Sequence, residues 1–130
     1  MKAEVVTEPV VVAVDDDVRM RESIARLAKS AGYAPVMFPS AEALLASGTL
    51  KGAGCLISDV RMPGMDGLEL QRRVSAESPS LPVILISGQL DEEVRQRGLR
   101  SGAIAFLYKP FDGEELLRAI QRALERGSKG

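Results

Sequence analysis

The most informative absence in this 130-residue sequence is histidine, of which it has none. Without an imidazole, the chain offers no Ser-His or Cys-His nucleophile pair and no histidine-ligated zinc site. Its single cysteine, Cys55, excludes an internal disulfide and suits a reducing compartment. Because Cys55 lies inside an apolar run, we interpret it as a buried structural thiol. Any chemistry must therefore come from carboxylates, hydroxyls, lysine or an oxygen-liganded metal ion.

The sequence also lacks an excess of charge of either sign and any long apolar run. Lys plus Arg total 17 against 18 Asp plus Glu, a balance that gives no basic footprint for nucleic acid or for a membrane surface. No apolar run approaches the roughly 20 residues of a membrane span. Residues 1–8 carry two acids and no apolar core, so they do not resemble a signal peptide. We expect a cytoplasmic protein that binds neither nucleic acid nor membrane directly.

Short apolar runs alternate with amphipathic helical patterns along the chain. The runs predict strands at 10–14, 34–38, 55–57, 83–86 and 104–107. Fully apolar strands separated by helices are typical of a parallel sheet that is covered on both faces. Pro35 places the second strand at an edge, which favours the order 2-1-3-4-5. The predicted fold is therefore α/β: a doubly wound, flavodoxin-like, five-stranded parallel sheet with five helices on its two faces.

The domain boundaries and helix starts follow from local signals. We expect a tail at 1–8, one domain at 9–126, and a frayed end or the start of a linker at 127–130. Ser40 and Asp91 are candidate N-caps, and capping-box spacings occur at Asp66 with Glu69 and at Asp112 with Glu115. Gly98 is expected to interrupt the helix that follows Asp91, which makes this helix the least stable of the five.

Polar residues follow four of the five predicted strands. They are Asp15-Asp16-Asp17 after the first strand, Asp59 after the third, Ser87 after the fourth and Lys109 after the fifth. The carboxyl ends of parallel strands share one rim, and the first and third strands flank the point where ligands bind. Several carboxylates in one crevice repel, and a hard divalent cation such as Mg²⁺ would neutralise them. Acids, metal, lysine and hydroxyl together are what phosphoryl transfer requires.

Each of these residues also has an ordinary structural interpretation. A run of aspartates is usually a solvated turn or a helix cap, and Asp59 could cap a turn. Ser87 could be an ordinary turn residue, and Lys109 could simply be solvated. The functional interpretation is favoured because four separate strand ends supply complementary groups.

These motifs give the sequence a family resemblance over almost its whole length. It resembles the response-regulator receiver domains (CheY-like) of two-component signal transduction. In its details it is similar to receivers of the FixJ/NarL type, which carry a helix-turn-helix output domain. The segments that carry the resemblance are 14–17, 59–67, 87–88 and 109–111.

The resemblance implies a role for each matching residue. Asp59 would be the phosphoacceptor, taking a phosphoryl group from a histidine kinase or a histidine phosphotransfer protein. Mg²⁺, or Mn²⁺ in its place, would be held by Asp15, Asp16, Asp59 and the backbone carbonyl of Arg61. Lys109 would pair with the phosphoryl group, and its peptide bond to Pro110 would be cis. Asp17 would be only a helix cap.

The resemblance also implies a switch. Ser87 would bond a phosphoryl oxygen, and Phe106 would move inward. The face formed by the fourth helix, fifth strand and fifth helix would then change its conformation. A homodimer formed through that face is one way of signalling. Arg61 and Gln89 occupy the positions that tune phosphoryl lifetime. Gln89-Leu90 stands where the FixJ/NarL type commonly has His-Gly, so neither lifetime nor partner is carried over.

Two other functions stay open from the sequence. One is a Mg²⁺-dependent phosphohydrolase with an aspartyl nucleophile. Such enzymes commonly use a general acid two residues beyond the nucleophile, where this chain has Arg61, which cannot donate a proton at neutral pH. The other is a phosphorylation-independent scaffold, although such receivers usually lose a site residue that this chain retains.

Overall fold

The computed structural model describes residues 8–128, so the predicted tail up to residue 7 and the last two residues lie outside the described part. Five strands form one sheet in the order β2-β1-β3-β4-β5, and all neighbouring pairs are parallel. The strands are β1 Val10–Val14, β2 Ala34–Phe38, β3 Cys55–Asp59, β4 Val83–Ser87 and β5 Ala105–Tyr108. This is the predicted flavodoxin-like α/β fold with the predicted strand order.

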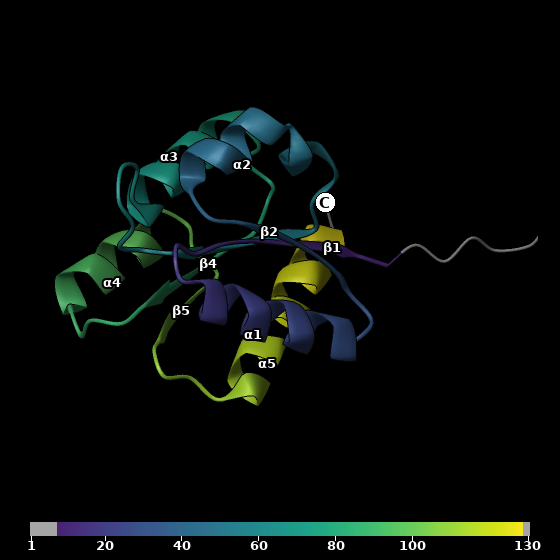
Figure 1. The fold of residues 1–130 in the computed structure, drawn as a ribbon. Coiled ribbons are helices and arrows are strands. Elements are labelled where there is room, and N and C mark those ends of the chain that lie inside the picture. The colour runs from purple at the N-terminus through teal and green to yellow at the C-terminus, as the bar shows by residue number, and fades with distance from the viewer. Residues whose placement is uncertain (1–7, 129–130) are drawn as a thin grey trace, which may run out of the picture.

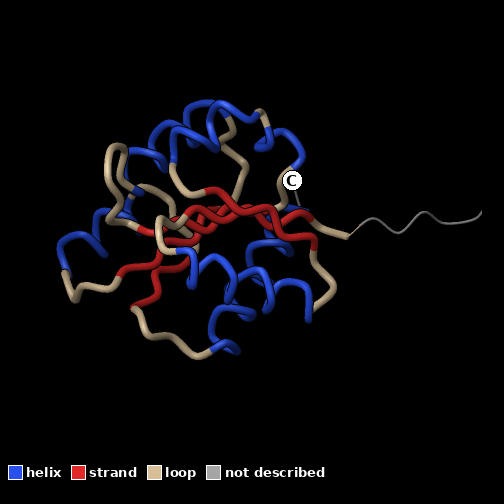
Figure 2. The backbone as a smooth tube through the Cα atoms, viewed as in Figure 1, coloured by secondary structure: helices blue, strands red, loops and turns tan. Residues whose placement is uncertain are grey.

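Five α-helices cover the sheet in two layers. They are α1 Val18–Ser30, α2 Ala41–Ser47, α3 Gly67–Glu77, α4 Glu92–Arg100 and α5 Gly113–Ser128. Helices α1 and α5 lie on one face, and α2, α3 and α4 lie on the other (Figure 1). The sheet therefore forms the middle layer, with the connecting loops at its two ends (Figure 2). Within the described residues, no helix combines the length and the apolar character needed to cross a bilayer.

Burial along the strands matches their positions in the sheet. Strands β3 and β4 are buried at every residue because helices cover both of their faces. Strand β2 is only half-buried throughout, as expected of an edge strand. Pro35 lies in β2 opposite Val11 of β1, and a proline is tolerated there because an edge strand has one unpaired side.

Helix starts confirm part of the capping prediction. The side chains of Ser40 and Asp91 accept backbone N–H bonds at the starts of α2 and α4. Asp66 accepts the N–H of Glu69 at 2.9 Å, but the Glu69 carboxylate binds two arginines of α3 instead of returning the bond. The spacing of Asp66 and Glu69 therefore yields half of a capping box.

The prediction that Gly98 interrupts the fourth helix is wrong. Helix α4 continues through Gly98, which is buried. A Cβ atom at Gly98 would lie 2.6 Å from Cδ1 of Leu85 and 3.6 Å from the Phe106 ring. A side chain at position 98 would therefore require the Leu85 side chain to shift, a constraint that helix propensity cannot reveal.

Several predicted boundaries also shift. Asp59 is the last residue of β3 and Ser87 the last of β4, instead of following those strands. Strand β5 begins and ends one residue later than predicted. Helix α5 extends to Ser128, past the boundary expected at 126. A short 3₁₀ helix that no local pattern predicts, Thr49–Gly52, precedes β3.

Candidate functional site

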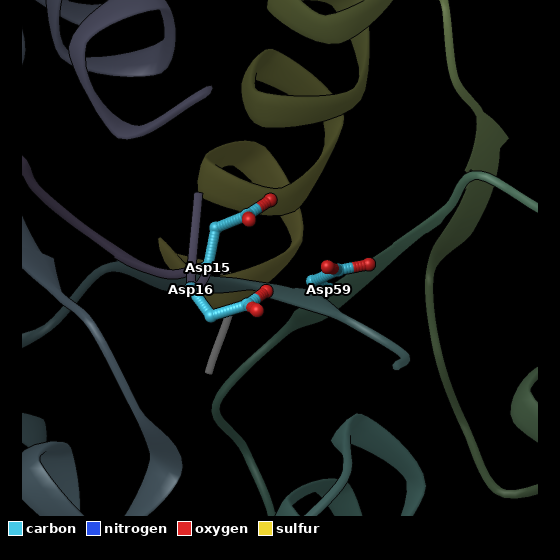
Figure 3. A group of neighbouring side chains, drawn as sticks. All are labelled: Asp15, Asp16 and Asp59. Atoms are coloured by element: carbon cyan, nitrogen blue, oxygen red, sulfur yellow. The ribbon is translucent and has the colours of Figure 1, made fainter. Parts of the chain in front are cut away.

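Three carboxylates meet at the carboxyl ends of β1 and β3. The two strands are parallel neighbours in which Val14 pairs with Ser58, so the residues that follow, Asp15 and Asp59, are adjacent. One oxygen each from Asp15, Asp16 and Asp59 can be chosen so that all lie within 4.8 Å of one another (Figure 3). Asp15 is fully buried, Asp59 is 6% exposed, and Asp16 faces solvent. The cluster therefore has one fully buried acid, one with a small exposed fraction and one exposed acid.

Lys109 is the cation at the centre of this cluster. Its Nζ lies 3.0 Å from Oδ2 of Asp15 and 3.3 Å from Oδ2 of Asp59. Lys109 directly follows β5, and its backbone N–H donates to the carbonyl of Ser87 at 2.7 Å, which fixes its position beside the end of β4. The peptide bond between Lys109 and Pro110 is cis. Residues from three strand ends thus share one ion-pair network.

The charges in this network do not balance. Burial, followed by the neighbouring Asp15 carboxylate, raises the pKa of Asp59, and the attraction of Lys109 offsets this only in part. Burial acts to lower the pKa of Lys109, but hydrogen bonds and charges from Asp15 and Asp59 outweigh it and raise that pKa. Burial is thus the main cause of the raised pKa of Asp59, whereas the two neighbouring carboxylates cause the raised pKa of Lys109.

The donor set fits a hard divalent cation. All three side chains offer carboxylate oxygens, which Mg²⁺ and Mn²⁺ accept in preference to softer ligands. The cluster carries more negative charge than Lys109 can neutralise, and Asp16 leaves one side open to solvent. A cation there would relieve the repulsion that raises the pKa of Asp59.

The turn after β1 is shaped by hydrogen bonds to Asp15. The backbone N–H of Asp17 donates to Oδ1 of Asp15 at 2.9 Å, and Asp17 itself caps α1. From inside α1, Nη1 of Arg21 donates to the carbonyl oxygen of Asp15 at 2.8 Å. Arg21 was not among the predicted site residues. These bonds fix the buried acid from both its side chain and its backbone.

The loop after β3, residues 61–66, is closed at its base. The N–H of Gly67 donates to the carbonyl of Val60 at 2.8 Å. A Cβ atom at Gly67 would overlap the carbonyl oxygen of Asp59, so α3 begins in contact with the backbone of the acid-bearing strand. Glycine is required at position 67 by this close approach.

Two predicted site residues lie near the rim without contacting the acids. Ser87 is buried, and its hydroxyl accepts from the N–H and donates to the carbonyl of Gln89, both at 3.2 Å. Phe106 is half-buried in β5, with its ring centroid 5.3 Å from that of Tyr108 in an edge-to-face arrangement. The structure therefore brings together the side chains of Asp15, Asp16, Asp59 and Lys109, whereas the Ser87 hydroxyl bonds to the backbone of Gln89 and the Phe106 ring contacts Tyr108.

The Arg61 side chain lies near the start of α4. Its Nη2 lies 3.7 Å from Oδ2 of Asp91, the residue that caps α4. Both side chains are about half exposed, so this pair adds little to stability. It does connect the loop after β3 with the start of α4.

Comparison with known proteins agrees with this geometry. The family model for the response regulator receiver domain matches residues 11–121. Nodulation protein W of Bradyrhizobium diazoefficiens is 39% identical over 126 residues, which cover 97% of this chain and 56% of that protein. Response regulator protein TmoT of Ectopseudomonas mendocina is 42% identical, covering 91% of this chain and 54% of that protein. The chain thus spans about half the length of these relatives.

Solved structures give the same result. A crystal structure described as FixJ-N is 35% identical with a TM-score of 0.82, covering 92% of this chain and 96% of that one. The chemotaxis protein CheY4 of Vibrio cholerae is 32% identical with a TM-score of 0.83, covering 91% of this chain and all of that one. From its sequence, its fold and its acidic cluster with lysine, this chain belongs to the response regulator receiver domain family.

Proposed function

We propose that Asp59 is the phosphoacceptor of this receiver. Receivers of two-component response regulators accept phosphoryl groups from histidine kinases on an aspartate and bind Mg²⁺ through acidic residues. The observation that carries the proposal is the network in which Asp59 lies beside two further acids and 3.3 Å from the ammonium group of Lys109. Asp59 is the one acid of the three that belongs to the central strand β3.

The proposed reaction uses the chain's own groups for position and charge. An Oδ atom of Asp59 attacks the phosphorus of a phosphohistidine, the oxygen–phosphorus bond forms, and the phosphorus–nitrogen bond breaks with its electron pair kept by the imidazole. Lys109, already paired with Asp59, follows the negative charge onto the phosphoryl oxygens. Asp15, Asp16, Asp59 and the backbone carbonyl of Arg61 would hold Mg²⁺ or Mn²⁺, which supplies charge neutralisation when bound.

The output of this reaction would be a change in the face formed by α4, β5 and α5. Ser87 would exchange its present bonds to the backbone of Gln89 for one to a phosphoryl oxygen. Phe106, half-buried against Tyr108, would then move toward the space that Ser87 leaves. The packing of Gly98 near Leu85 and Phe106 supports this proposal, because a movement of the Phe106 ring would change the packing of α4 against the sheet.

Arg61 and Gln89 would set the lifetime of the phosphoryl group. Gln89 is exposed two residues after Ser87, and the Arg61 side chain lies near Asp91. Either side chain could obstruct a water molecule that approaches the phosphorus.

The partners follow from the same proposal. The chain would act in the cytoplasm, where its donor would be a histidine kinase or a histidine phosphotransfer protein. The signal would pass through the α4–β5–α5 face to an output domain or a partner, which includes a second copy of this chain. One relative is named transcriptional regulatory protein FixJ, and we propose that any DNA contact is made by the output part, since this domain has a net charge of −1.

The test is incubation with Mg²⁺ and acetyl phosphate, followed by intact-mass measurement. We expect one phosphoryl mass gain that requires Mg²⁺ and disappears in Asp59→Asn but persists in Asp66→Asn, a neutralised acid in the nearby loop. An unchanged mass with several donors would refute the proposal and favour a scaffold. Release of many equivalents of phosphate from monoesters would instead indicate a phosphohydrolase.

A further inference from the structure

A carboxylate on α2 holds the loop that follows the acid-bearing strand. Oε2 of Glu42 accepts the backbone N–H of Met65 at 2.9 Å, although the two residues are 23 positions apart. This hydrogen bond to Met65 is the chief reason why the pKa of Glu42 lies below its usual value. The carboxylate is therefore an ionised acceptor at every physiological pH.

The loop is shaped to receive this carboxylate. Gly64 has a φ angle of +76°, a conformation that side chains rarely adopt. A Cβ atom at Gly64 would also lie 2.6 Å from Oε2 of Glu42. Gly64 thus has two roles: it allows the chain to turn, and it leaves room for the Glu42 carboxylate beside the Met65 N–H.

The hydrogen bond between Glu42 and Met65 is one of three interactions that hold the loop after β3 in place. The bond from Gly67 to Val60 closes the base, Met62 is buried in the core, and Glu42 holds the outer turn. Arg61 lies between the base and the outer turn. We therefore expect the position of its backbone carbonyl to depend on the outer turn as well as on the base and Met62.

We propose that Glu42 is a positioning residue for the divalent-cation site, holding the loop so that the Arg61 carbonyl faces the cation. The inference rests on the proposed function, because it assumes that this carbonyl is a metal ligand. Residues that orient metal ligands from outside the coordination shell typically change metal affinity by 10-fold to 100-fold when they are removed. For Glu42 we expect a loss of metal affinity near 10-fold, because this residue is exposed and acts on only one metal ligand.

The test compares Glu42→Ala, Glu42→Gln and a control, Glu77→Ala, which removes the same charge at the far end of α3. Calorimetry should show Mg²⁺ binding weakened about 10-fold in Glu42→Ala and unchanged in the control. Glu42→Gln should restore most of the affinity, because an amide oxygen can still accept the Met65 N–H. In metal-free protein, the Met65 amide should exchange its hydrogen faster in Glu42→Ala alone.

A kinetic measurement separates positioning from catalysis. With acetyl phosphate, Glu42→Ala should need more Mg²⁺ for its half-maximal rate and reach the wild-type rate at saturation. Equal Mg²⁺ affinity in Glu42→Ala and wild type would overturn the inference and leave the proposed function intact. Equal losses in Glu42→Ala and Glu42→Gln would also overturn it, since charge and not the hydrogen bond would then matter. A wild-type chain that binds no Mg²⁺ would overturn both.

Discussion

Replacing Asp59 by asparagine should stabilise the metal-free protein. At an effective dielectric of about 20, two unit charges 4.8 Å apart repel by about 3.5 kcal/mol, and charges 3.3 Å apart attract by about 5 kcal/mol. Asp59 is repelled by the buried Asp15, more weakly by Asp16, which faces solvent, and is attracted by Lys109. These charge interactions largely offset one another, and burial, the largest cause of the raised pKa of Asp59, leaves its charge unfavourable by about 2 kcal/mol.

The assay is urea unfolding at pH 7 in the presence of a chelator. A gain of about 2 kcal/mol should raise the midpoint by about 1 M, for a slope of about 2 kcal/mol per molar urea. Glu77→Gln, which neutralises an exposed acid outside the cluster, should leave the midpoint unchanged. An unchanged or lower midpoint for Asp59→Asn would show that burial and the neighbouring acids do not disfavour the Asp59 charge.

The pH dependence has a definite sign. The folded protein holds a proton on Asp59 more tightly than the unfolded chain does, because the folded-state pKa is raised. The wild type therefore gains stability as pH falls through the folded-state pKa toward the unfolded value of about 4. The advantage of Asp59→Asn should shrink over this window. It should also shrink in Mg²⁺, since at ten times its dissociation constant a ligand stabilises the wild type by about 1.4 kcal/mol.

Three further perturbations test the site and its supports. Lys109→Met should destabilise the protein by about 3 kcal/mol in urea unfolding at pH 7, because it leaves buried acids unpaired. The pKa of Lys109 is raised in the folded protein, so the difference between the variant and the wild type should disappear as pH rises through the folded-state pKa of Lys109. Burial raises the pKa of Cys55 to about 12, so iodoacetamide at pH 8 should label it only as fast as the protein unfolds, and faster labelling would mean local opening of β3. Gly67→Ala should cost about 2 kcal/mol, because its Cβ overlaps the Asp59 carbonyl, whereas Gly52→Ala, with open space around it, should change the urea midpoint little.

The fold was predictable because its signals are local. Apolar runs such as Val83 to Ile86 and the edge proline Pro35 each act within one strand, and together they determine the order of the sheet. The acidic site followed from the same reasoning, since residues after parallel strands must share one rim. The convergence of Asp15, Asp59 and Lys109 needed only the strand order.

Contacts between elements were not predictable in this way. Glu42 reaches Met65 across 23 residues, and Gln71, a fully buried side chain of α3, donates to the carbonyl of Gly98 in α4 at 3.0 Å. No spacing rule links such pairs, because they depend on how helices pack. The error at Gly98 has the same origin: propensity measures the helix alone, whereas the residue was determined by the distance between α4 and the sheet.

The close approach at Gly98 also makes two positions interdependent under mutation. Gly98→Ala alone should improve helix propensity by about 1 kcal/mol, yet its methyl group would strike Cδ1 of Leu85. Leu85→Val alone would leave a cavity, whereas in the double variant the added methyl group fills the space that the leucine gives up. The effects of the two substitutions on the free energy of unfolding should therefore not be additive. The double variant should lose less stability than the sum of the two single losses. If the two residues changed one at a time during evolution, the protein with only one of the two substitutions would be less stable than either the original pair or the double variant.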